Sequence, residues 1–153
     1  MVGMTVNKKK LDALINNLTG FANSLNYRKP LTRSVEVLRY EQQTNFKQQG
    51  RKYGTWKKLS DKTKKQRKKL GFPPARPILR RTGNLERGFR AYVLNDKLAK
   101  TSNVVPYAIY HQEGTAYMPQ RRIMGITRNS RKAIGLIFSQ FIAGQIRQYF
   151  YKR

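Results

Sequence analysis

The sequence predicts an α+β fold, in which a small antiparallel sheet is packed by a long C-terminal helix and an N-terminal helical hairpin, with an extended basic arm. Apolar residues recur at helical spacing near both ends of the chain. Between them, glycine and proline interrupt short stretches of alternating apolar residues, which is typical of strands and tight turns. Strand–helix–strand repeats are absent, which argues against a parallel sheet.

The length of 153 residues suits a single domain. Its predicted parts follow the chain in order: residues 1–50 form the helical hairpin, 51–77 a basic arm, 78–126 a β-rich core, and 127–153 the C-terminal helix.

The N-terminal part predicts two helices. The first spans Asn7 to Leu25, carries its apolar residues on one stripe, and can be capped by Asn7. Pro30 suits the first turn of the second helix, which Gly50 ends. The short connection over 26–29 predicts that the two helices pack as a hairpin, with both stripes in the core.

The basic arm is predicted to hold one exposed helix. Trp56 precedes it as an expected packing anchor, and Ser60 is a good N-cap. Six cations in eight positions cannot share one face, so the helix is expected to be exposed on nearly all sides. These cations are Lys62, Lys64, Lys65, Arg67, Lys68 and Lys69. They are either simply solvated or contact nucleic-acid phosphates or an acidic subunit.

The β-rich core predicts a hairpin between short helical turns. In order, the expected elements are a turn over 82–85, a strand over 87–94, its partner over 97–103, a helix over 107–112, and a strand over 117–124. Gly114 is expected to stop the short helix.

The C-terminal helix is the strongest prediction, from Asn129 to Tyr151, with Thr127 or Asn129 as its cap. Its apolar stripe comprises Ile134, Ile137, Phe138, Phe141, Ile142, Ile146, Tyr149 and Phe150. Laid across the small sheet, this stripe would complete the core.

The charge of the chain indicates its partners. Lys and Arg total 33 against 7 Asp and Glu, a net charge of +26, which favours a polyanion or an acidic protein surface nearby. The lack of cysteine excludes disulfides and thiolate metal sites. No apolar run suggests a signal peptide or a membrane span, so synthesis in the host cytoplasm is expected.

Catalytic chemistry is not indicated. His111 is the one histidine, its nearest carboxylate in sequence is Glu113, and the acidic residues are scattered singly. We therefore expect no catalytic residue, metal or cofactor, and a structural hydrogen-bonding role for His111.

The ordered series 78–85, 106–114 and 119–125, with Trp56 to Ser60 upstream, resembles the virion morphogenesis or tail completion family of tailed bacteriophages. The resemblance is carried from Trp56 to the end of the chain. Its candidate interface or motif residues are Trp56, Arg80, Arg81, Thr82, Gly83, His111, Gln112, Gly114, Pro119, Gln120 and Arg121.

The resemblance implies a structural protein of the virion neck, not an enzyme. Similar proteins complete or terminate the tail and join it to the head connector, as ring oligomers that are commonly hexamers. The implied partners are further copies of the chain, the tail tube, and the head connector or stopper, with genomic DNA possible in the lumen.

The alternative is a basic nucleic-acid-binding protein without sequence specificity. It is supported by the charge of +26 and by aromatic residues beside basic ones. Strong binding to DNA in the lumen would hinder ejection, so we favour protein partners for the basic arm.

Overall fold

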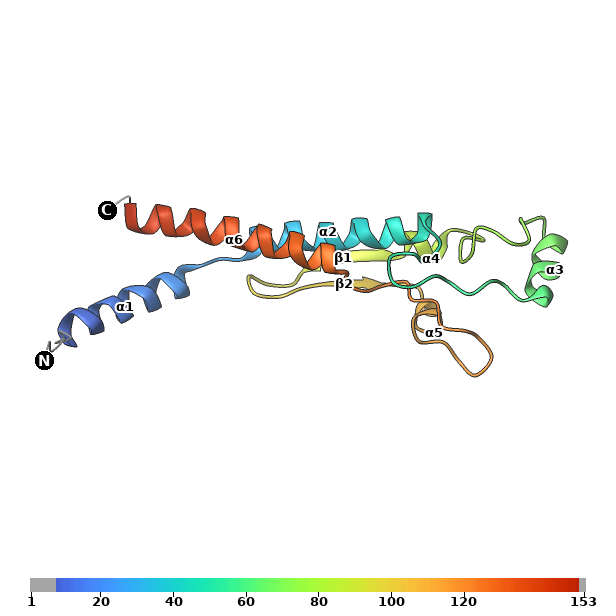
Figure 1. Ribbon diagram of the computed structural model, residues 1–153, viewed down its shortest axis with the longest axis horizontal. Coiled ribbons are helices and arrows are strands. Elements are labelled where there is room, and N and C mark those ends of the chain that lie inside the picture. The colour runs from blue at the N-terminus through green and yellow to red at the C-terminus, as the bar shows by residue number, and fades with distance from the viewer. Residues whose placement is uncertain (1–7, 152–153) are drawn as a thin grey trace, which may run out of the picture.

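The computed structural model describes residues 8–151 and confirms the α+β class (Figure 1). Its elements are α1 (Lys8–Ser24), α2 (Arg28–Lys47), α3 (Asp61–Lys69), α4 (Asn84–Arg87), β1 (Phe89–Val93), β2 (Ala99–Asn103), α5 (Ala108–Glu113) and α6 (Arg128–Tyr151). The proposed cap Asn7 and the last two residues of the segment 127–153 lie outside the described residues.

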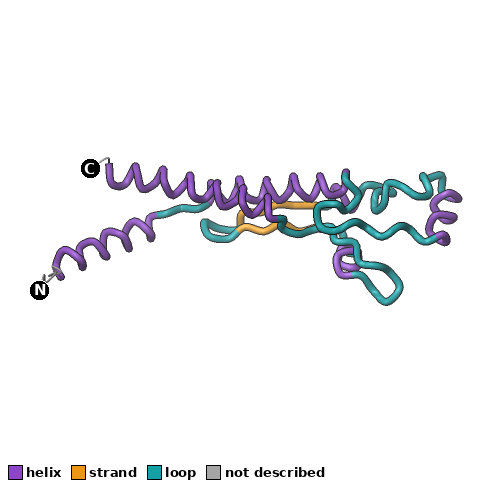
Figure 2. The backbone as a smooth tube through the Cα atoms, in the orientation of Figure 1, coloured by secondary structure: helices purple, strands orange, loops and turns teal. Residues whose placement is uncertain are grey.

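The predicted hairpin is confirmed. Strands β1 and β2 pair antiparallel, with Phe89 opposite Asn103 and Val93 opposite Ala99. The turn is closed by Leu94 N, which donates to the Leu98 carbonyl at 2.9 Å. In the part of the chain that the structure describes, this hairpin is the only sheet (Figure 2).

The hydrophobic core lies under α2, which packs over both strands and also against α6. Phe46 of α2 is fully buried, and its ring centroid lies 5.1 Å from that of Trp56 and 5.7 Å from that of Phe89. Helix α2 therefore makes the main helix contact with the sheet, and α6 packs against α2. The buried face of α2 also supplies polar contacts to the sheet, since Gln42 Nε2 donates to Thr101 Oγ1 at 3.0 Å.

The two N-terminal helices are present, but they do not fold back on each other as a hairpin. Helix α1 leads into α2 in nearly the same direction, and α6 runs back along both (Figure 1). The main tertiary contacts of α2 are with the sheet and with α6. Phe21 of α1 instead meets α6, with its ring 5.2 Å from Tyr149.

The strand predicted over 117–124 is not formed, apart from one bridge between Thr115 and Met118. Side chains from other elements bind this segment instead. Gln112 Oε1 accepts from the backbone N–H groups of Ile123 and Met124, at 2.9 and 3.0 Å. The backbone is therefore satisfied without a neighbouring strand.

The short elements follow their sequence signals. Thr127 caps α6, since its Oγ1 accepts from Ser130 N at 3.2 Å. Ser60 Oγ accepts from Thr63 N at 3.3 Å at the start of α3. None of the helices within residues 8–151 has the length and apolar character that crossing a bilayer requires.

Candidate functional site

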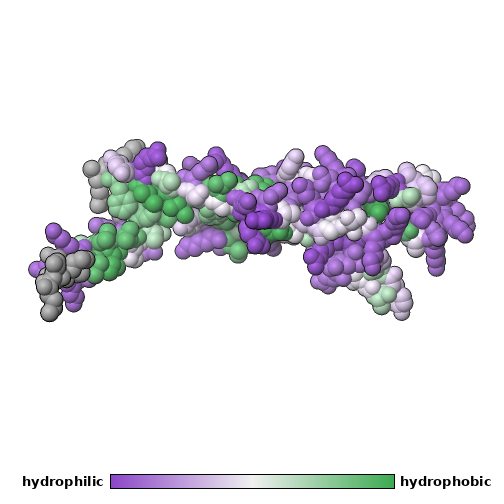
Figure 3. All heavy atoms as spheres, in the orientation of Figure 1, coloured by the Kyte–Doolittle hydropathy of each residue, from purple (hydrophilic) through white to green (hydrophobic). Residues whose placement is uncertain are grey.

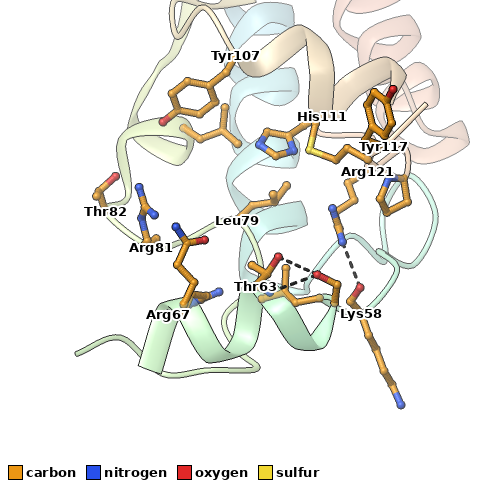
Figure 4. A pocket seen from close by; sticks show the side chains of 16 residues that line it. Lys58, Thr63, Arg67, Leu79, Arg81, Thr82, Tyr107, His111, Tyr117 and Arg121 are labelled. Carbon is orange, nitrogen blue, oxygen red and sulfur yellow. Dashed lines mark hydrogen bonds between the residues drawn. The ribbon is translucent and has the colours of Figure 1, made fainter. Parts of the chain in front are cut away.

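A cavity of about 440 Å³ lies between α3, α5 and the loops around Leu79 and Pro119 (Figure 4). It gathers residues from four separate stretches of the chain, and none of its lining residues is acidic. Six residues singled out from the sequence line it: Arg67, Arg81, Thr82, His111, Pro119 and Arg121. The cavity is therefore where the basic arm and the family motifs meet.

Arg67 is the most unusual residue of the cavity, because it is only 5% exposed. Its Nη1 donates to the Pro77 carbonyl at 3.1 Å. Its Nε and Nη2 are buried and hydrogen bond to no other described residue. The expectation that α3 is exposed on nearly all sides is thus wrong for this residue, which faces inward while its neighbours face solvent.

Arg121 forms the opposite wall and is also 5% exposed. Its Nε and Nη2 donate to the carbonyls of Lys57 and Lys58, at 3.0 and 3.2 Å. Its backbone N–H donates to the His111 carbonyl at 2.7 Å. Burial lowers the pKa of the Arg121 guanidinium from its ordinary value, but a guanidinium stays protonated in proteins. The residue therefore ties the arm to α5 and keeps its charge at the cavity wall.

His111 lies between the two walls, with its ring 6.1 Å from that of Tyr107 in an edge-on arrangement. Burial, and secondly the charge of Arg121, lower the pKa of His111, so the imidazole is neutral at neutral pH. Its Nδ1 is buried and hydrogen bonds to no other described residue. Only the backbone carbonyl of His111 accepts a hydrogen bond among the described residues, so the expected hydrogen-bonding role of its side chain stays a prediction.

Arg81 stands at the mouth of the cavity and is exposed. Its guanidinium lies 5.9 Å from the centre of the Phe72 ring. On the α3 side, the hydroxyl groups of Ser60 and Thr63 share a hydrogen bond of 2.9 Å. Arg67, Arg81 and Arg121 thus line one cavity together with several polar side chains, and such a lining suits an anion.

Other predicted site residues have structural positions. Trp56 is 3% exposed and donates from Nε1 to the Arg122 carbonyl at 2.8 Å, so it belongs to the core and is closed to partners. Arg80 pairs with Glu86. Gly83 precedes α4 with a φ of 79°.

The segment around α5 is equally structural. Gly114 ends α5 with a φ of 81°, and a Cβ there would lie 2.8 Å from Gln120 N. Gln120 Nε2 donates to the Gln112 carbonyl at 2.9 Å. These residues form the frame that positions His111 and Arg121.

The lysines of α3 do not line the cavity. Lys62, Lys65, Lys68 and Lys69 are exposed, whereas Lys64 is half-buried. The Lys64 ammonium bonds to Asp61 at 2.8 Å, and this bond lowers the pKa of Asp61. The basic arm therefore has two sides, one lined by solvated lysines and one carrying Arg67 into the cavity.

The candidate site residues predicted from the sequence do not include the apolar part of the cavity wall. Leu79, Tyr107, Tyr117 and Met118 line it beside the cations. Tyr117, fully exposed, lies close in sequence to the predicted Pro119 and Gln120, and Tyr107 and Tyr117 are among the aromatic residues that the sequence places beside basic ones. Within residues 8–151, no three His, Asp or Glu side chains gather as metal ligands would.

A second surface is apolar and lies at the other end of the molecule. Leu11, Leu14, Ile15 and Leu18 of α1 are each about half exposed, from 45 to 51%. Along α6, Ser130 is the one buried residue, so the predicted apolar stripe is incompletely covered. Figure 3 shows apolar side chains on α1 and on the C-terminal half of α6 at this end. Exposed apolar surface of this kind is typical of protein–protein interfaces.

Comparison with known proteins gives one match. Searches of curated proteins and of solved structures found no match. The model of the phage virion morphogenesis family matches residues 7–142. The match includes α1 and α2, upstream of the stretch from Trp56 that carries the sequence resemblance. Because it spans most of the chain, the protein belongs to the phage virion morphogenesis family.

Proposed function

We propose that this protein is a structural component of the phage neck, which completes or terminates the tail and joins it to the head connector as a ring oligomer. Family membership supports a role in assembling the virion. The proposed ring is a hexamer, and its proposed neighbours are the tail tube and the head connector or stopper. We propose that the protein acts by binding other virion proteins, and we infer no enzymatic activity.

The observation that carries this proposal is the half-exposed apolar face of α1. A 17-residue helix with few contacts to its own domain is marginal in water, because helices of this length depend on packing for stability. Its four exposed aliphatic side chains would gain that packing from a neighbouring copy. If α1 contacts a different surface of the next subunit, the contact is heterologous and can close into a ring.

A second candidate function is non-specific binding of nucleic acid, and the exposed lysines of α3 favour it. These are Lys62, Lys65, Lys68 and Lys69. Such a surface would track phosphates without reading bases. Binding to DNA would then weaken steeply as salt is raised, because the phosphates release counterions.

The proposal is tested by electron microscopy of lysates from a phage that lacks this gene, with and without the protein supplied from a plasmid. The expected result is heads and tails that are made but unjoined, or tails of irregular length, with normal particles restored by the plasmid. Tail length separates joining from termination. Normal infectious particles without the protein would refute the neck assignment.

A further inference from the structure

We propose that the cavity between α3 and α5 binds a carboxylate carried by an acidic segment of another virion protein, through Arg67, Arg81 and Arg121. The inference rests on the proposed function, because the assembled virion supplies that second protein. It adds a binding site and the chemical class of its ligand, which the family match does not give.

The first argument is the unsatisfied guanidinium of Arg67. Two of its nitrogen atoms, Nε and Nη2, are buried and make no hydrogen bond within residues 8–151. A buried cation without a partner is costly, and the cost is relieved when an anion accepts its N–H groups. A carboxylate fits this need, because its two oxygens can accept parallel hydrogen bonds from one guanidinium.

The second argument is that no anion of the same chain fills this role. None of the residues that line the cavity is acidic. Elsewhere, Glu36, Asp61 and Glu86 already pair with cations of the chain, and Glu41 is buried in α2. A second copy is a poor donor, since it carries the same net charge of +26. Charge complementarity therefore points to a different, acidic protein.

The third argument concerns the shape and lining of the cavity, which favour a protein segment over DNA. Arg67 and Arg121 are each 5% exposed, so a slender side chain reaches them more readily than a phosphate of rigid duplex DNA. Leu79, Tyr107 and Met118 provide an apolar wall beside the cations. A peptide can match both parts, with a carboxylate at the guanidinium groups and an apolar neighbour on the wall.

His111 supplies a built-in reporter for the experiment. It is the one histidine of the chain and lines the cavity, so a single imidazole resonance reports on this site alone. In the protein without a bound peptide, burial and the charge of Arg121 lower the pKa of His111. A carboxylate bound beside Arg121 would favour the imidazolium and raise the pKa again.

The test measures the pKa of His111 by NMR titration of the full chain at physiological ionic strength. Three probes are compared. They are a blocked pentapeptide with two glutamates around a leucine, the same peptide with glutamines in place of the glutamates, and a short DNA duplex. We expect the glutamate peptide to raise the His111 pKa by about one pH unit. The glutamine peptide and the DNA should leave it unchanged, even where the DNA binds the lysines of α3.

Variants locate the site. Arg81→Gln removes an exposed guanidinium at the cavity mouth and should weaken binding of the glutamate peptide about tenfold. Arg131→Gln removes the same charge from the exposed surface of α6 and should leave binding unchanged. The His111 titration of each variant without peptide confirms that the cavity is folded.

Three results would overturn the inference. The glutamate peptide could bind without moving the His111 pKa, or Arg131→Gln could weaken it as much as Arg81→Gln. The DNA duplex could shift His111 where the peptide does not, which would make this a phosphate site. All three results are measured on the isolated protein. They can therefore be distinguished from a failure of the neck assignment, which is tested by electron microscopy of lysates.

Discussion

The exposed face of α1 gives a quantitative prediction for the double variant Leu14→Ser with Leu18→Ser. Full burial of a leucine side chain contributes about 1.5–3 kcal/mol. Leu14 is 51% exposed and Leu18 is 48% exposed, so covering the remaining half of each contributes about 1 kcal/mol. The double variant should therefore lose about 2 kcal/mol per subunit contact, which weakens association about 30-fold.

The assay is native mass spectrometry over a concentration series, with sedimentation velocity as a second measurement. The matched control is Leu94→Ser with Leu98→Ser at the tip of the hairpin. These side chains are 50% and 52% exposed, so the control removes similar apolar surface outside α1. Urea unfolding of both variants should show similar, small losses, since neither pair is buried.

The reasoning is refuted if the wild-type chain stays monomeric at every concentration. It is also refuted if the hairpin variant dissociates the oligomer as strongly as the α1 variant. In either case the exposed aliphatic side chains of α1 would not be a subunit contact, and the ring would lose its main support.

Three further predictions concern stability. Gln112→Ala removes three hydrogen bonds to residues 123 and 124, and should lower the free energy of unfolding by about 3 kcal/mol in urea titrations. Gln120→Ala removes one exposed bond, and a loss as large as that of Gln112→Ala would contradict this account. Gly50→Ala places a Cβ against the indole ring of Trp56 at a residue with a φ of 93°, and it should lower the free energy of unfolding by about 2–3 kcal/mol. Gly54 has a φ of 119°, but a Cβ there meets open space, so Gly54→Ala should cost only the backbone strain. Equal melting temperatures for the two glycine variants would refute the steric argument. Finally, the folded-state pKa of His111 is lowered, so its stabilising contribution is present above pH 6.5 and declines as the pH falls toward the folded pKa. His111→Gln should remove this part of the acid sensitivity, measured as melting temperature against pH, and an unchanged profile would contradict it.

Features set by local sequence could be predicted. The hairpin follows from alternation in β1 and from the turn residues before β2, and burial along β1 alternates accordingly. Ser60 and Thr127 cap their helices because the cap depends only on residues within one turn. Gly114 ends α5 for the same local reason, since it takes up a positive φ.

Features set by contacts between distant segments could not be predicted. An apolar stripe shows that a helix has a partner, but not which partner, and the stripes of α1 and α6 were both assigned to the core. The overlooked signal was the spacing of polar residues on the apolar side of α2. Gln42 and Asn45 are buried there, and their amides bond to the sheet and to the Arg122 carbonyl. Amides on an apolar stripe indicate that the helix packs against groups that need hydrogen-bond partners.

The sequence predicted several residues of the candidate site, but it did not predict that they lie together in one cavity. Arg81, His111 and Arg121 were named for the family resemblance, and Arg67 for the charge of the arm. Nothing local distinguishes Arg67 from the lysines around it. Its burial follows from the return of the chain at Pro77, whose carbonyl accepts its hydrogen bond, and such a contact depends on the whole loop.

The positions of the two surfaces connect the proposals. The apolar face of α1 lies at one end of the molecule and α3 at the other (Figure 1). In a closed ring, rotation places every basic arm at an equivalent position around the axis. The arms then repel one another, because each subunit carries a net charge of +26. An acidic partner that places a carboxylate in each cavity would reduce this repulsion and fill the site at Arg67 in one step. Closure of the ring and attachment to its neighbour would then be thermodynamically linked, since each would strengthen the other by the same factor. The acidic peptide that shifts His111 should accordingly lower the protein concentration at which the oligomer forms, and the glutamine peptide should leave that concentration unchanged.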